Sequence, residues 1–194
     1  MADDEPTPNG LLIADQELAA AVGRVAMESA LQEELLRDVL ALLVGDSGWI
    51  LFEGQSAEWL IQACRISLNE VDHWHSRWKE SDHERFNELL RQTDHLRKIR
   101  NVVVHGRWED SPYNDEVVPR PWGAWENSQA YYCLRSRLRR GFETRAFTVP
   151  DLTRLAESIY GNSIDLADHV RQMHRAWVGS KYPALPRWRK RTTA

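Results

Sequence analysis

The 194-residue sequence contains only two cysteines, Cys64 and Cys133, which are far apart in the chain. This separation gives neither a disulfide framework nor metal-ligand spacing, so we expect a reducing compartment, the cytoplasm by default. No apolar run approaches the roughly 18 to 20 residues that a membrane span needs, and the start MADDEPTPNG is acidic where a signal peptide is basic. The sequence therefore predicts a protein that is neither secreted nor embedded in a membrane.

The usual phosphate-binding loops are also missing. There is no GxGxxG and no GxxxxGK followed by Ser or Thr, and no serine or cysteine lies in a nucleophile motif. The formal net charge of -4 provides no global field that would attract nucleic acid. Any RNA binding must therefore come from local basic patches.

The composition is that of an ordinary globular protein, with 42% apolar and 28% charged residues. The length suits one domain, or one domain with an appendage. Residues 1–10 are rich in acids and proline and are expected to form a disordered acidic tail, and residues 179–194 a basic extended tail. The folded domain is predicted over residues 11–178.

Apolar residues recur at three- and four-residue spacing over residues 14–44, which predicts a long first helix. Gly45 follows the pattern directly and suits its C-terminal cap. Ser56 suits the N-cap of a second helix, whose apolar positions continue toward Trp74. Both segments predict amphipathic helices with one face in a core.

A third helix is expected from about Asp82, where acids cluster, until Gly106 stops it. Thr148 and Asp151 approximate a capping box, and a fourth helix follows with apolar positions as far as Met173. The sequence therefore predicts a mainly α protein, a bundle of four to five helices.

Residues 107–147 interrupt this helical pattern. Residues 107–125 combine prolines and tryptophans without a clear period, which predicts an ordered loop. The stretch AYYCLRSRLRRGFETRAFTV alternates aromatic and β-branched residues with arginines on each side of Gly141, which predicts a β-hairpin. We expect a Trp-rich loop and a small hairpin inserted after the third helix.

The third helix ends in the segment RNVVVHG, whose polar residues suit the chemistry of RNA cleavage. At about 100° per residue, Arg97, Arg100, Asn101 and His105 fall within an arc of roughly 140°, and Asn101 and His105 are one turn apart. Histidine is the natural base near neutral pH. Arginine matches two phosphate oxygens with its planar fork, and asparagine could orient the histidine or the phosphate. The pattern predicts attack of a 2′-hydroxyl on the neighbouring phosphate.

The segment LRKIRNVVVHG resembles the signature of the HEPN (higher eukaryotes and prokaryotes nucleotide-binding) superfamily, which is an Arg, a polar residue that is often Asn, and a His four to six positions after the Arg. Arg100, Asn101 and His105 match it position by position. An Asn directly after the Arg and a Gly directly after the His lower the chance expectation to the order of one in a thousand. The order of the helices over residues 14–178 is similar as well, whereas the Trp-rich loop and the hairpin depart from the simple bundle.

This resemblance implies a HEPN-like helical bundle that forms a homodimer, in which two copies of the motif meet in one cleft. It implies that Arg100, Asn101 and His105 are catalytic and cut RNA without a metal or other cofactor, leaving a cyclic phosphate. Toxins and antiviral ribonucleases are typical members, which leaves room for an antitoxin or other regulatory protein as a partner. The RNA substrate is left open.

Six further residues are candidates for RNA contacts, five as cations near the motif or in the hairpin and one as an aromatic platform. They are Arg97, Trp108, Arg135, Arg137, Arg139 and Arg140. The hairpin arginines equally suit a charged edge strand, the basic tail suits a solubilising role, and the tryptophan suits a packing anchor.

Two histidine patterns suggest metal binding or assistance to catalysis. His73 and His75 do not face one another on a helix, so we expect no metal site. Asp165 and His169 are four residues apart and could assist catalysis, although such spacing more often reflects a solvent-exposed side-chain pair on one helix.

Two other functions remain open on the sequence. One is a non-catalytic HEPN-like dimer that binds RNA, nucleotide or a protein partner, with the motif as a buried polar cluster. The other is a structural helical domain in a defence or toxin–antitoxin assembly.

Overall fold

The structure, a computed structural model, describes residues 15–44, 52–71, 79–110, 117–118, 129–137 and 141–177. The chain forms two compact units. Unit 1 comprises residues 1–27 and 98–156, and unit 2 comprises residues 28–97 and 157–194. The expected tails at residues 1–10 and 179–194 lie outside the described residues.

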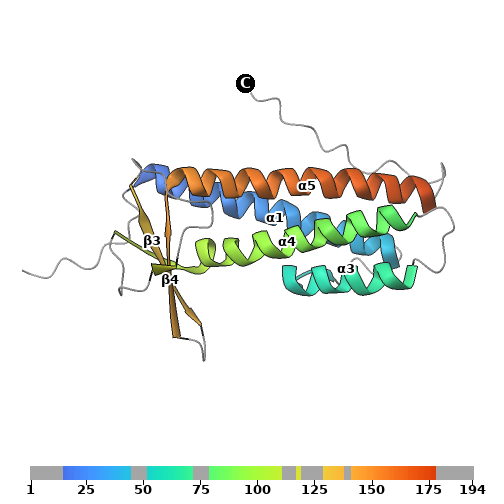
Figure 1. Cartoon of the computed structure of the whole chain (residues 1–194), viewed down its shortest axis with the longest axis horizontal. Coiled ribbons are helices and arrows are strands. Elements are labelled where there is room, and N and C mark those ends of the chain that lie inside the picture. Colours follow the sequence, from blue (N-terminus) through green and yellow to red (C-terminus); the bar gives the residue numbers. More distant parts are fainter. Residues whose placement is uncertain are drawn as a thin grey trace, which may run out of the picture. The chain divides into compact units, whose positions relative to one another are not determined.

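The described residues form four helices (Figure 1), which are α1 (Gln16–Val44), α3 (Ala57–Val71), α4 (Glu80–His105) and α5 (Val149–Trp177). The prediction of a mainly helical protein is confirmed, and each helix begins within two residues of its predicted start. No helix in the described part of the chain is long and apolar enough to cross a membrane.

The predicted N-caps are present. The Ser56 hydroxyl accepts a hydrogen bond from the Trp59 backbone N–H at 3.2 Å, at the start of α3. At the start of α5, the Asp151 carboxylate accepts hydrogen bonds from the backbone N–H and the hydroxyl of Thr148, both at 2.9 Å. Such bonds satisfy donors that a helix leaves without a partner at its first turn, which explains why these helices begin where they do.

A four-stranded sheet in unit 1 has the order β1-β3-β4-β2. Strands β3 (Tyr131–Arg137) and β4 (Gly141–Phe147) pair antiparallel, which confirms the predicted hairpin. Strand β1 (Arg107–Glu109) adds antiparallel to β3, and β2 (Val117–Val118) adds parallel to β4.

The prediction of a loop without strands over residues 107–125 is therefore wrong at two places, β1 and β2. Strands of three and two residues are too short to show an alternating pattern. Their backbone partners come from the hairpin, more than twenty residues further along the chain, so no local signal marks them.

Unit 2 contains a continuous apolar core to which four helices contribute. Burial of such side chains stabilises a fold by roughly 1.5 to 3 kcal/mol each. The largest members of this core include Leu36, Leu40, Leu60, Ile61, Leu68, Phe86, Leu89, Leu90 and Leu166.

In unit 1, the last turns of α4 pack against the sheet. Val102 and Val103 on the helix and Cys133 and Phe147 on the strands are fully buried. The motif segment therefore lies at the junction of a helix end and a sheet, where side chains of the sheet contact its backbone.

Candidate functional site

The C-terminal end of α4 is anchored by two side chains of the sheet. The last four carbonyls of a helix have no partner within it. The Cys133 thiol donates to the Val102 carbonyl at 3.1 Å, and the Trp108 indole N–H donates to the Val103 carbonyl at 3.1 Å. The Trp108 ring also packs against Phe147, with ring centroids 5.8 Å apart. These contacts fix the backbone from which His105 projects.

Gly106 allows this close approach of helix and strand. A Cβ atom at this position would overlap the Cys133 sulfur and would lie 2.6 Å from the Val102 carbonyl oxygen. Contacts shorter than about 3 Å would force the helix end and the strand apart, because the Cys133 thiol and the Val102 carbonyl are joined by a hydrogen bond. The glycine that follows the histidine in the motif therefore has a packing role.

Arg100 and Asn101 are joined by a hydrogen bond. The Arg100 Nη1 atom donates to the Asn101 Oδ1 atom at 2.9 Å, and both residues are half-buried. Burial lowers the pKa of the Arg100 guanidinium from its ordinary value, but arginine remains charged at neutral pH. A cation that is partly removed from water attracts a phosphate more strongly than one in bulk solvent.

His105 lies at the last turn of α4 and is exposed. Within the described residues its side chain has no hydrogen bond or ion pair. It follows Asn101 by one helical turn, so the two residues share a side of the helix. The structure thus brings Arg100 and Asn101 together directly, and helical geometry places His105 beside Asn101.

Arg97, predicted to contact RNA, is held by carboxylates in unit 2. Its guanidinium forms ion pairs with Asp94 at 2.8 Å and with Glu58 at 3.2 Å, and its side chain is only 11% exposed. In this arrangement the charge is already compensated, so the geometry does not favour a phosphate contact at Arg97.

The hairpin arginines differ in how far the structure describes them. Arg135 is half-buried on β3, and Arg137 is the last residue of that strand. Arg139 and Arg140 lie outside the described residues. Arg145 on β4 forms an ion pair with Glu143.

Trp108 has the packing role that was the alternative to base stacking. Its indole N–H is used by the helix end and its ring contacts Phe147, although the side chain stays half-buried. The sequence allows this role but does not give its contacts, because the register of β1 on β3 creates them.

Asp165 and His169 do not form a pair. Asp165 binds Arg85 at 3.1 Å, while the buried His169 ring stacks on Phe86 and places Nε2 2.9 Å from the Asp82 carbonyl oxygen. Burial lowers the pKa of His169. We regard this histidine as part of the core of unit 2, while His73 and His75 lie outside the described residues.

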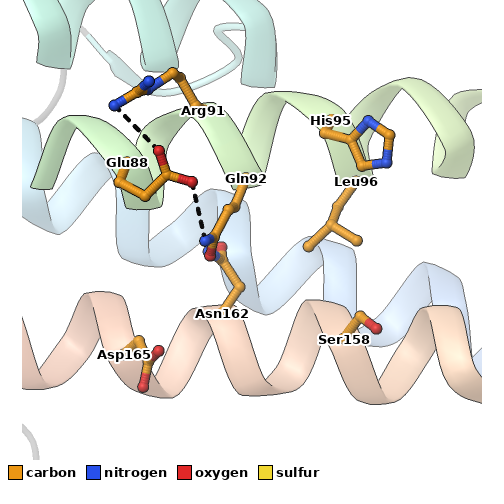
Figure 2. A pocket seen from close by; sticks show the side chains of 8 residues that line it. All are labelled: Glu88, Arg91, Gln92, His95, Leu96, Ser158, Asn162 and Asp165. Carbon is orange, nitrogen blue, oxygen red and sulfur yellow. Dashed lines mark hydrogen bonds and ion pairs between the residues drawn. The ribbon is translucent and has the colours of Figure 1, made fainter. Parts of the chain in front are cut away.

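A pocket lies in unit 2 between α4 and α5, with a volume of about 550 Å³ (Figure 2). No motif in the sequence marks this pocket, although its lining residues repeat at helical spacing on both helices. They are Glu88, Arg91, Gln92, His95, Leu96, Ser158, Asn162 and Asp165.

Most polar groups of this pocket are already paired. The Glu88 carboxylate binds Arg91 at 3.0 Å and accepts from the Gln92 amide at 3.2 Å. Asn162, which extends from α5 toward α4 in Figure 2, accepts from Gln32 and Thr93, each at 2.8 Å. His95 and Ser158 are the polar lining residues without a partner in the described part of the chain. The pocket therefore has fewer uncommitted groups than its lining suggests.

Within the described residues, no group of three or more His, Cys, Asp or Glu side chains is arranged to hold a metal ion. Comparison of the chain with protein-family models, with curated proteins and with solved structures finds no match.

Proposed function

We propose that this protein is a metal-independent endoribonuclease of the HEPN kind, which cleaves RNA by attack of a 2′-hydroxyl on the adjacent phosphate. One observation carries the proposal. The hydrogen bond from Arg100 to Asn101 draws the guanidinium toward the side of α4 that Asn101 shares with His105. A cation for the phosphate and a base for the hydroxyl are then neighbours at the end of α4, where His105 is exposed.

Each residue has a defined task in this reaction. His105 removes the proton of the 2′-hydroxyl, the 2′-oxygen bonds to phosphorus, and the bond from phosphorus to the 5′-oxygen breaks. Arg100 stabilises the negative charge that grows on the non-bridging oxygens, and Asn101 keeps the guanidinium in place. The departing 5′-oxygen takes up a proton, so the products are a 2′,3′-cyclic phosphate and a 5′-hydroxyl.

A homodimer would supply the second proton-transfer group. The leaving oxygen needs an acid while the 2′-hydroxyl needs a base. His105 is the only histidine in residues 1–27 and 98–156, which make up unit 1. We therefore propose that a second copy of the chain contributes its own His105 to the same cleft.

The proposed setting is the cytoplasm, with a role in defence or as a toxin. Cys64 and Cys133 are both buried free thiols, which fits a reducing compartment. An antitoxin or other regulatory protein would keep such an activity in check, and RNA is the proposed substrate.

The test is incubation of the purified protein with a mixed RNA pool in EDTA, with analysis of the product ends. We expect 2′,3′-cyclic phosphates from the parent and a rate loss of at least about 10²-fold in His105→Ala, the usual contribution of a general base. Arg100→Ala should lose a comparable factor. His95→Ala is the matched control, because His95 is exposed on the same helix and should leave the rate unchanged.

Two results would contradict the proposal. If folded His105→Ala and Arg100→Ala proteins cut RNA as fast as the parent, the assignment of these residues is wrong. If the folded parent cuts nothing while His105→Ala lowers the thermal stability, the motif is a structural cluster. The chain is then better described as a non-catalytic binding module.

A further inference from the structure

The register of two strands places an arginine next to the proposed base. Strand β1 pairs with β3 so that Trp108 lies opposite Cys133 and Arg107 lies opposite Leu134. Continued by one residue toward α4, this antiparallel register sets Gly106 opposite Arg135. The close approach of Gly106 to the Leu134 carbonyl, where a Cβ would lie 3.2 Å away, agrees with that continuation. Arg135 therefore lies beside the residue that follows His105.

Arg135 shares a face of the sheet with the helix anchor. Residues two apart on a strand point to the same side, so Arg135 lies on the face where the Cys133 thiol meets the Val102 carbonyl. The positive charge of Arg135 also lowers the pKa of the Cys133 thiol, against the larger effect of burial, which raises it. Both observations place the guanidinium on the side of the sheet that α4 covers at its end.

No carboxylate in the described residues holds Arg135. Glu143 lies opposite it on β4, but the Glu143 carboxylate is bound by the Nε atom of Arg145. Within the described residues the Arg135 guanidinium has no hydrogen bond or ion pair, and the residue is only half-buried. An anion from outside the chain is the partner that such a cation lacks.

Other arginines near the motif are already compensated. Arg107 lies on the opposite face of the sheet, because it pairs with Leu134, and it forms an ion pair with Glu109. Arg97 is bound by two carboxylates. The sequence gives no reason to prefer Arg135 over Arg97 as an RNA contact. The strand register and the ion pairs distinguish Arg135 from Arg97, Arg107 and Arg145.

Arg100 and Arg135 lie on two sides of His105. Arg100 precedes the histidine by five residues, roughly 7.5 Å along the helix axis, whereas Arg135 lies beside the residue after it. In the proposed reaction Arg100 holds the phosphate that is cleaved, which leaves Arg135 for a phosphate next to it. Resting on the proposed function, we infer that Arg135 binds a second phosphate of the RNA, next to the one that is cleaved. The substrate is then an RNA chain with at least two phosphodiesters.

Two substrates distinguish a contact of Arg135 with a second phosphate from a general effect of this residue on the reaction. A dinucleoside monophosphate has only the phosphate at the cleaved bond, while an eight-nucleotide RNA has phosphates on both sides. Arg135→Ala should raise KM for the octamer by about tenfold at unchanged kcat, the size expected for one charged hydrogen-bonded contact. It should leave kcat/KM for the dinucleoside monophosphate unchanged. Arg107→Ala is the matched control and should alter neither value.

Binding can be measured without cleavage, with an octamer that carries 2′-O-methyl riboses. The slope of log Kd against log salt should fall by about 1 in Arg135→Ala, as for the loss of one phosphate contact, and stay at the parent value in Arg135→Lys. His105→Ala should bind with the parent slope. Circular dichroism of each variant checks that it is folded.

The outcomes distinguish this inference from the function on which it rests. If His105-dependent cleavage is found and Arg135→Ala matches Arg107→Ala on both substrates, the second phosphate site is wrong and the ribonuclease stands. If the parent cuts nothing but the slope change at Arg135 is found, the RNA contact stands and the catalytic proposal fails. Equal slopes in all variants overturn the inference outright.

Discussion

At the scale of single residues, the fit of Gly106 against the sheet is the feature most open to test. In Gly106→Ala, the added methyl group would meet the Cys133 sulfur and the Val102 carbonyl oxygen. Overpacking of this kind costs roughly 1 to 3 kcal/mol. We expect a loss of that size in the free energy of unfolding, measured by urea denaturation, together with a loss of the proposed ribonuclease activity because the His105 backbone shifts.

Gly161→Ala is the control for this substitution. Gly161 lies inside α5, is exposed, and has nothing within 4 Å of an added Cβ. Alanine should therefore stabilise the helix by up to about 1 kcal/mol. Cys133→Ala in the Gly106→Ala background should recover part of the loss, since it removes the sulfur but leaves the carbonyl. Equal stability of Gly106→Ala and the parent would show that the helix end is not held as described.

The proximity of the motif residues could be predicted from the sequence because their spacing is local. Arg100, Asn101 and His105 lie on one helix, and helical geometry alone relates them. The difference in ion pairing between Arg135 and Arg97 could not be predicted. It depends on Glu58 and on a strand register, both far away in the chain, although the ion pair of Arg97 with Asp94 three residues earlier is a local signal.

At the scale of elements, a buried polar cluster joins three helices of unit 2. Asn162 on α5 accepts from Gln32 on α1 and from Thr93 on α4, and its amide donates to the Leu89 carbonyl at 3.3 Å. All three polar side chains are buried. Asn162→Ala would remove the acceptor of the buried Gln32 amide, whereas the Thr93 hydroxyl could still donate to the Leu89 carbonyl at 2.8 Å, so we expect a loss of about 1 to 3 kcal/mol in urea denaturation.

A nearby residue and a double-mutant cycle make this prediction specific. Ser158→Ala, one turn before Asn162 and without a hydrogen-bond partner in the described residues, should change stability by less than about 0.5 kcal/mol. Asn162→Ala and Thr93→Val should combine with a coupling energy of roughly 1 kcal/mol or more, because each removes the other's partner. Simple additivity of the two losses would show that the cluster is not a connected network.

Elements with strong local signals could be predicted, and elements that depend on distant partners could not. Ser56 and Thr148 marked the starts of α3 and α5 because capping uses neighbours in the chain. Strands β1 and β2 gave no comparable signal. The burial of Asn162 could not be predicted from the sequence of α5, since it is decided by packing against α1 and α4.

At the scale of the whole molecule, the division of the chain into units bears on how the proposed reaction is completed. Three helices, α1, α4 and α5, contribute residues to both units. The hydrophobic periodicity of the sequence therefore does not reveal where one unit ends and the other begins. The unit that contains the motif contains no histidine besides His105. If each chain supplies only His105 to the proposed reaction, its two proton transfers are best served by two chains, and a symmetric dimer presents the same segment of both copies at one interface.

A mixing experiment tests this dimer through its activity. Equal amounts of parent and His105→Ala are incubated until subunits exchange, at a concentration where sedimentation shows dimers. With random exchange, half of the parent chains pair with a variant chain, and the activity should fall to about half because a cleft with one histidine lacks a proton-transfer group. Mixing with His95→Ala should give additive activities instead. If the parent keeps its full activity after exchange with His105→Ala, each chain works alone and the shared cleft is wrong.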